Sequence, residues 1–157
     1  MMTFGNAYFR KLENGFVVGT GRLEREYRAE PSGLRAVSLR HTEWGIMGET
    51  EAPVWQNEKL IPPGTVGYLA DVYAEVSDDS GFTSRHLQVT AHYYYPAIRL
   101  SVRLEIWLYP DADGIRTQLF LKGANGVKQE VHNRAEVYDK TSRYLMSHLE
   151  SDNDYEV

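Results

Sequence analysis

The residues best suited to bind a ligand are aromatic side chains at alternate positions of predicted strands. The chain has 11 Tyr, 3 Trp and 5 Phe among 157 residues. In the segment RLSVRLEIWLY, residues 99–109, Trp107 and Tyr109 share one face with Glu105, and apolar residues take the other. Tyr94 takes the corresponding face of the preceding segment. An exposed Trp or Tyr offers a flat apolar surface to a sugar ring, so this pattern is typical of carbohydrate-binding surfaces.

These aromatic side chains have a second interpretation, as packing beneath loops or against another domain. Trp44 and Trp55 flank a segment rich in Gly, Pro and Glu and extend the candidate set. Arg, Gln, Glu and His side chains beside the aromatic rings could bind sugar hydroxyls. The candidate carbohydrate-binding residues are therefore Trp107, Tyr109, Tyr94, Trp44, Trp55 and Glu105. Both interpretations stay open, because alternation does not show whether a polar face is exposed to solvent or covered by loops or another domain.

Catalytic signatures are absent, and no catalytic residue, metal site or cofactor is predicted. The chain has no Cys, no G-x-S-x-G, no H-E-x-x-H and no phosphate-binding loop. His86 and His92 would share one strand face but lie about 20 Å apart at ~3.3 Å per residue. Asp78 with Asp79, and Asp111 with Asp113, fall in predicted turns, where Asp caps the backbone locally. Glu105 is expected to form a cross-strand ion pair with Arg116 or a similar neighbour.

Charge and hydropathy exclude several classes of partner. The formal net charge is −5, with charges mixed along the chain, so we expect no nucleic-acid binding. No apolar run approaches the length of a membrane span, so no membrane partner is expected. The first residues show no apolar signal region, which together with the missing Cys favours a cytoplasmic location.

Period-2 alternation and turn residues predict an all-β fold. The clearest alternation lies in residues 85–95, 99–109 and 115–123. Further strands are expected at 7–12, 16–21, 22–30, 34–43 and 69–79, with one short strand inside 44–68. Residues 136–151 fit either a short C-terminal helix or a final strand. Nine or ten strands joined by short turns predict a single antiparallel β-sandwich domain over residues 1–157.

Three segments carry a resemblance to a known family. They are VGTGRLEREY (18–27), GLRAVSLRH (33–41) and YPDADGIRTQLFLKG (109–123). The chain resembles the N-terminal domain of the α-galactosidase-like glycoside hydrolases, the clan of family 36 and the melibiase relatives. The resemblance implies a β-sandwich of the galactose-mutarotase-like, or supersandwich, type. In that family the domain precedes a (β/α)₈ barrel that carries the catalytic carboxylates.

The resemblance leads to one main functional expectation and two alternatives. The main expectation is a non-catalytic accessory domain, excised from a longer glycoside hydrolase that acts on α-galactosides or related glycans. Its partners would be the catalytic barrel of the same chain and carbohydrate. The first alternative is a free-standing carbohydrate-binding module with an aromatic platform. The second is a mutarotase-like sugar isomerase that uses Glu105 or a His as acid and base.

Overall fold

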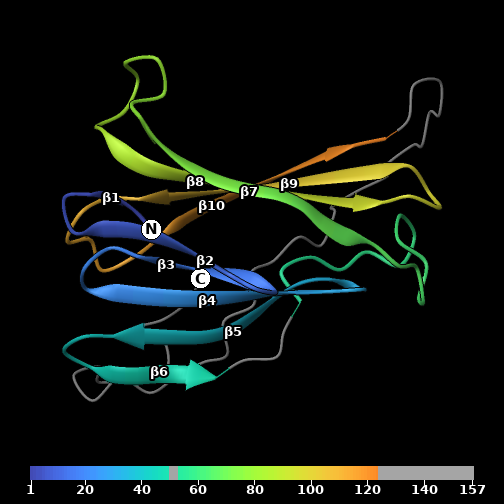
Figure 1. Ribbon diagram of the computed structural model, residues 1–157, viewed down its shortest axis with the longest axis horizontal. Coiled ribbons are helices and arrows are strands. Elements are labelled where there is room, and N and C mark those ends of the chain that lie inside the picture. Colours follow the sequence, from blue (N-terminus) through green and yellow to red (C-terminus); the bar gives the residue numbers. More distant parts are fainter. Residues whose placement is uncertain (50–52, 124–157) are drawn as a thin grey trace.

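The computed structural model describes residues 1–49 and 53–123, which form ten strands in two antiparallel sheets (Figure 1). The six-stranded sheet contains, in order, β1 (Met2–Phe4), β2 (Ala7–Leu12), β3 (Gly15–Gly19), β4 (Leu23–Glu30), β5 (Gly33–His41) and β6 (Gly45–Glu49). The four-stranded sheet contains, in order, β10 (Arg116–Lys122), β9 (Leu100–Leu108), β8 (His86–Tyr95) and β7 (Tyr68–Ser77). The predicted all-β antiparallel sandwich is confirmed.

Each sheet is a meander, because consecutive strands pair through short turns. Glu13 and Asn14 form the turn between β2 and β3, and Gly15 starts β3. Gly15 has φ +153°, and a Cβ there would lie 2.1 Å from the carbonyl oxygen of Tyr27 on β4. Only glycine therefore permits β3 to approach β4 this closely.

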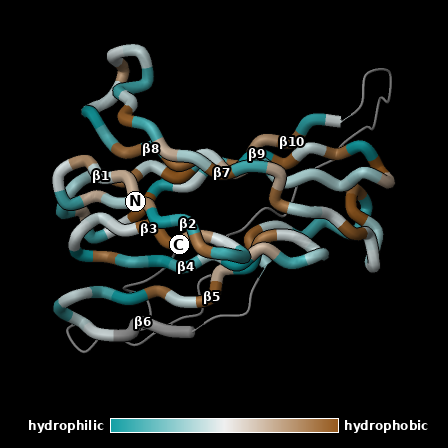
Figure 2. Tube along the Cα trace, in the orientation of Figure 1, coloured by the Kyte–Doolittle hydropathy of each residue, from teal (hydrophilic) through white to brown (hydrophobic). Residues whose placement is uncertain are grey.

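One core fills the space between the two sheets. Along β8 and β9 the inward side chains are fully or almost fully buried. Hydrophobic residues recur along both strands (Figure 2). The core residues contributed by these two strands are Leu87, Val89, Ala91, Tyr93, Tyr95, Leu100, Val102, Leu104, Ile106 and Leu108. The six-stranded sheet contributes Phe9, Phe16, Val18, Tyr27, Leu34 and Ala36 to the same cluster. The core therefore explains the period-2 pattern read from the sequence.

One further element was not expected, and one expected element is found. Strand β1 was not predicted, and it pairs with β2 through a turn at Gly5, whose φ is +55°. The short strand expected within 44–68 is β6, at the start of that segment. The helix or strand expected at 136–151 lies outside the described residues.

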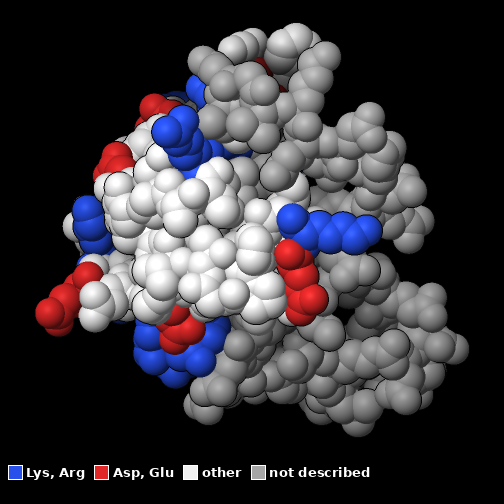
Figure 3. All heavy atoms as spheres, turned by 90° about the vertical axis from the view of Figure 1, so that its right-hand side faces the viewer, with Lys and Arg blue, Asp and Glu red and all other residues white. Residues whose placement is uncertain are grey.

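At one end of the sandwich, hydroxyl groups tie β8 to the turn between β4 and β5. Tyr93 donates a hydrogen bond to the carbonyl oxygen of Pro31 at 2.9 Å, and Tyr95 donates one to that of Ser32 at 2.6 Å. The backbone N–H of Gly67 also reaches the Pro31 carbonyl, at 2.7 Å. Figure 3 views this end of the molecule, where the described surface is broadly uncharged and the charged side chains lie at its margins.

Candidate functional site

The outer face of the four-stranded sheet, the face turned away from the six-stranded sheet, carries aromatic and polar side chains in cross-strand rows. The rows are Tyr68 with Tyr94; Asp71, His92, Arg103 and Phe120; Tyr73, Thr90, Glu105 and Gln118; and Glu75, Gln88, Trp107 and Arg116. The assignment of Trp107, Glu105 and Tyr94 to a non-core face is thereby confirmed. Neighbouring rows alternate with the core positions, so the strands themselves set the spacing of this surface.

Trp107 is enclosed rather than exposed. Its indole ring stacks on the imidazole of His86 from β8, with 4.4 Å between ring centroids, and the guanidinium of Arg116 from β10 lies 4.3 Å from the indole centroid. Trp107 is 5% exposed and His86 is fully buried. Because β9 lies between β8 and β10, the two neighbours occupy the two sides of the indole. Trp107 therefore has no free face on which a sugar ring could stack.

Buried polar atoms without partners gather around this stack. The Nδ1–H of His86 donates to the carbonyl oxygen of Ser84 at 2.9 Å, which leaves Nε2 as an acceptor. Three buried atoms have no hydrogen-bond partner among the described residues: His86 Nε2, the indole nitrogen of Trp107 and the Thr83 hydroxyl oxygen. Such groups are uncommon in folded proteins, and each one invites an explanation.

Exposed tyrosines form the accessible part of the same face. Tyr68 is 53% exposed and Tyr73 is 41% exposed. Tyr68 meets half-buried Tyr94 edge to face, with 6.1 Å between centroids, and Tyr73 stacks on His92 at the same distance. These rings, rather than Trp107, present aromatic surface to solvent.

Sequence reasoning missed Tyr68 because the expected strand began one residue later, and it missed Tyr73 because of a β-bulge. The register of β7 with β8 shifts between Leu69 and Asp71, so one extra residue interrupts the alternation. Counting backwards from Val76 would have placed Val72 inward and Tyr73 outward, since the period is regular from the bulge to the end of β7.

The other predicted site residues lie in three different places. Tyr109 follows β9 and packs beside His86, with 5.1 Å between ring centroids. Trp44 stacks on His41 at 3.7 Å, beside the six-stranded sheet. Trp55 is a core residue whose indole N–H donates to the hydroxyl of Tyr95 at 2.8 Å. The structure therefore separates Trp44 and Trp55 from the surface formed by the other four residues.

The cross-strand ion pair predicted for Glu105 is wrong, because Glu105 pairs with Arg103 of its own strand. Arg103 Nε lies 3.3 Å from the Glu105 carboxylate, along the same strand, while Arg116 covers Trp107 instead. The guanidinium of Arg103 thus engages one of the two carboxylate oxygens of Glu105. His92 lies on the same face, one row away from Glu105. The acid–base role of Glu105 in a sugar isomerase stays a prediction.

The aspartates of the turn between β9 and β10 bind the opposite sheet. Asp113 accepts a hydrogen bond from His41 Nε2 at 2.9 Å and pairs with Arg22 Nε at 3.1 Å. The Nδ1 of His41 accepts the backbone N–H groups of Glu43 and Trp44. Both ring nitrogens are thus occupied, so His41 has no lone pair free to act as a base. This His41–Asp113 latch joins the two sheets.

Replacing Asp113 with alanine should lower the free energy of unfolding by about 1–3 kcal/mol, because it leaves the buried Nε2–H of His41 unsatisfied. Glu43→Ala is the matched control, since it removes only the exposed 3.1 Å ion pair with Arg22. The control should cost less than about 1 kcal/mol. Urea denaturation of both variants measures the difference. Equal losses would show that the latch contributes no more than a surface ion pair.

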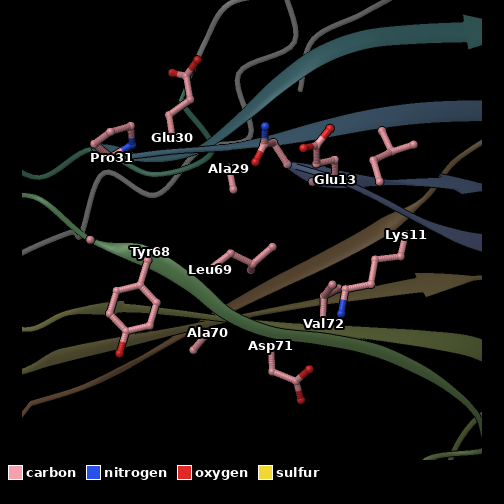
Figure 4. Close-up of a pocket in the computed structure, with 14 residues that line it drawn as sticks. Lys11, Glu13, Ala29, Glu30, Pro31, Tyr68, Leu69, Ala70, Asp71 and Val72 are labelled. Carbon is pink, nitrogen blue, oxygen red and sulfur yellow. The ribbon is translucent and has the colours of Figure 1, made fainter.

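A cleft of about 380 Å³ opens between the two sheets beside β7. Leu69 and Val72 point into it from β7, and Tyr68 points away, as Figure 4 shows. Lys11, Glu13, Glu30, Pro31 and Asp71 are among the other residues that line it. The lining carries both signs of charge and no convergent polar pair, so it indicates no particular chemistry.

The titratable groups of the described chain show no catalytic arrangement. Burial raises the pKa of Tyr8, and its hydrogen bond to Glu24 raises it further. Within residues 1–49 and 53–123, no group of three or more His, Cys, Asp or Glu residues is placed to hold a metal ion. Over the same residues, no helix is long and apolar enough to cross a membrane.

Comparison of the chain with protein-family models, with curated proteins and with solved structures gives no match in any of the three. The geometry of the outer face and the three sequence segments that carry the resemblance are therefore the observations that bear on function.

Proposed function

We propose that this domain is a non-catalytic carbohydrate-binding module, and that the outer face of its four-stranded sheet holds the sugar. The observation that carries the proposal is the pair of exposed tyrosines, Tyr68 and Tyr73, beside Tyr94 and His92 on one continuous face. Their rings offer apolar surface to the C–H groups of a sugar. Glu105, Arg103 and Gln118 lie in the neighbouring rows and supply groups that bind hydroxyls.

The resemblance to the N-terminal sandwich domains of α-galactosidase-like glycoside hydrolases supports the same class of ligand. It adds the proposal that the module accompanies a catalytic barrel and contacts related glycans. Trp107, the residue expected to lead the platform, takes a different role here. Trp107 packs between His86 and Arg116, so we expect it to hold these two side chains in place rather than to stack on the ligand.

Replacing Tyr73 with alanine should weaken binding of a neutral galacto-oligosaccharide about tenfold. One face of a tyrosine ring covers roughly 60 Å² of apolar surface, worth about 1.5 kcal/mol at ~25 cal/mol per Å², and each 1.4 kcal/mol changes the affinity about tenfold. Isothermal titration calorimetry measures the change. Phe82→Ala is the control, because Phe82 is the most exposed aromatic residue in the described chain and lies in the loop between β7 and β8.

The control should bind as the unmodified protein does. Two results would overturn the proposal. One is the absence of binding by every neutral and acidic glycan tried at high millimolar concentration. The other is an equal loss of affinity in the Tyr73 and Phe82 variants.

A further inference from the structure

The outer face of the four-stranded sheet is unevenly charged. The positions contributed by β9 and β10 include three cations, Arg103, Arg116 and Lys122, and one carboxylate, Glu105. The β7 positions instead carry the carboxylates of Asp71 and Glu75. This concentration of cations contrasts with the net charge of −5 of the whole chain. We call Arg103, Arg116 and Lys122 the cationic strip.

Two guanidinium groups of the strip lie over aromatic rings. Arg116 lies 4.3 Å from the centroid of Trp107, and Arg103 lies 4.1 Å from that of Phe120. Stacking holds the planar group in place while its N–H donors point outward in the plane. Arg116 is exposed and forms no ion pair with the described residues, so its fork of donors is available for an anion.

The unsatisfied atoms beside Arg116 add a second, independent observation. The indole N–H of Trp107 is a buried donor without an acceptor, and His86 Nε2 is a buried acceptor without a donor. A carboxylate that binds Arg116 can accept the indole N–H when the guanidinium shifts. A ligand with an acidic group therefore meets the need of this donor, whereas His86 is fully buried on the other side of the indole.

We propose that the cationic strip selects acidic glycans, whose sugars carry carboxylates; this inference rests on the proposed function. Arg116 binds a carboxylate through its fork of donors, and the site extends to Lys122 on the edge strand β10 and to Arg103 on the neighbouring strand β9. Six residues separate Arg116 from Lys122, or about 20 Å at ~3.3 Å per residue. The site therefore fits an extended oligosaccharide with several acidic units rather than a monosaccharide.

The test compares tetragalacturonate with its fully methyl-esterified form, which differ chiefly in charge. At low salt the acid should bind the unmodified protein at least tenfold more tightly, and added sodium chloride should reduce this preference. Arg116→Gln should bring the two affinities to within about twofold. Arg116→Lys should keep part of the preference, because it retains the charge and loses the fork. Arg10→Gln, on β2 of the other sheet, is the matched control and should leave the preference unchanged.

Equal affinity for acid and ester in the unmodified protein would overturn the inference. An equal effect of Arg10→Gln and Arg116→Gln would also overturn it, since the preference would then reflect overall charge. If the ester binds and Tyr73→Ala weakens it, the carbohydrate-binding proposal holds even where the acidic preference fails. Thermal unfolding of each variant shows whether the fold is retained, and Lys122→Gln provides a second variant of the strip.

Discussion

Replacing Trp55 with alanine should lower the free energy of unfolding by about 3–5 kcal/mol. Trp55 is buried within the cluster that joins the two sheets. Its ring meets Tyr93 edge to face at 5.3 Å, and its indole N–H donates to Tyr95. Alanine removes the largest side chain of the region, leaves a cavity and deprives the Tyr95 oxygen of a donor. Gly33 lies against the same ring, since a Cβ added there would come within 3.1 Å of the indole nitrogen.

Trp44→Ala is the matched control, because the same side chain is lost from a partly exposed position over His41. The stacking contact there is worth about 1 kcal/mol. Chemical denaturation followed by circular dichroism measures both variants. A loss at Trp55 as small as that at Trp44 would contradict the assignment of Trp55 to the core.

Raising the pH above about 10 should unfold the domain cooperatively, because buried phenols must then ionise. Burial raises the pKa of Tyr93, and the neighbouring Tyr95 and Glu30 raise it further. Burial also raises the pKa of Tyr95, against a smaller lowering by the hydrogen bond from Trp55. Both phenols donate hydrogen bonds to carbonyl groups in the β4–β5 turn, and the ionised form cannot donate.

The sign of the effect follows from the bound protons. Above the pKa of an unfolded tyrosine, near 10, the unfolded chain has lost a proton that the folded chain retains. Alkali therefore favours the unfolded state, by up to about 1.4 kcal/mol per pH unit for each such group. The stabilising contribution is complete below about pH 10 and is lost as the pH rises toward the raised pKa.

The double variant Tyr93→Phe, Tyr95→Phe tests the cause. It should be less stable than the unmodified protein near neutral pH, since its carbonyl partners lose their donors. Its melting temperature should then fall less steeply between about pH 9 and pH 11. Tyr68→Phe is the control on the exposed face and should keep the original slope. Identical slopes in all three proteins would show that other groups cause alkaline unfolding.

The strands of the four-stranded sheet could be predicted because one side of each faces a core. In β9 the sequence alternates apolar and polar residues, and burial alternates over most of its length. Burial departs from this alternation at Trp107, whose outward side chain is covered by His86 and Arg116. Alternation assigns a face to a side chain, but the neighbours that cover it come from other strands.

The segment around Trp55 could not be placed from sequence, because it has no periodicity. Its position depends on contacts with Tyr93, Tyr95 and Gly33, which lie far away along the chain. Asp113 poses the same difficulty. Local chemistry predicts a turn there, and the structure adds a hydrogen bond to His41, which lies 72 residues away.

The sequence by itself determined the fold class, most strand boundaries and the buried faces of β8 and β9. These properties depend on period-2 alternation and on local turn residues, which neighbouring positions encode. Only the tertiary structure decided which aromatic rings are accessible. In the structure the solvent-exposed rings of this face are those of Tyr68 and Tyr73, on the strand that contains the bulge. The ring of Trp107 is not accessible, because side chains of β8 and β10 cover it. Accessibility is a property of packing between distant segments, and no local pattern records it.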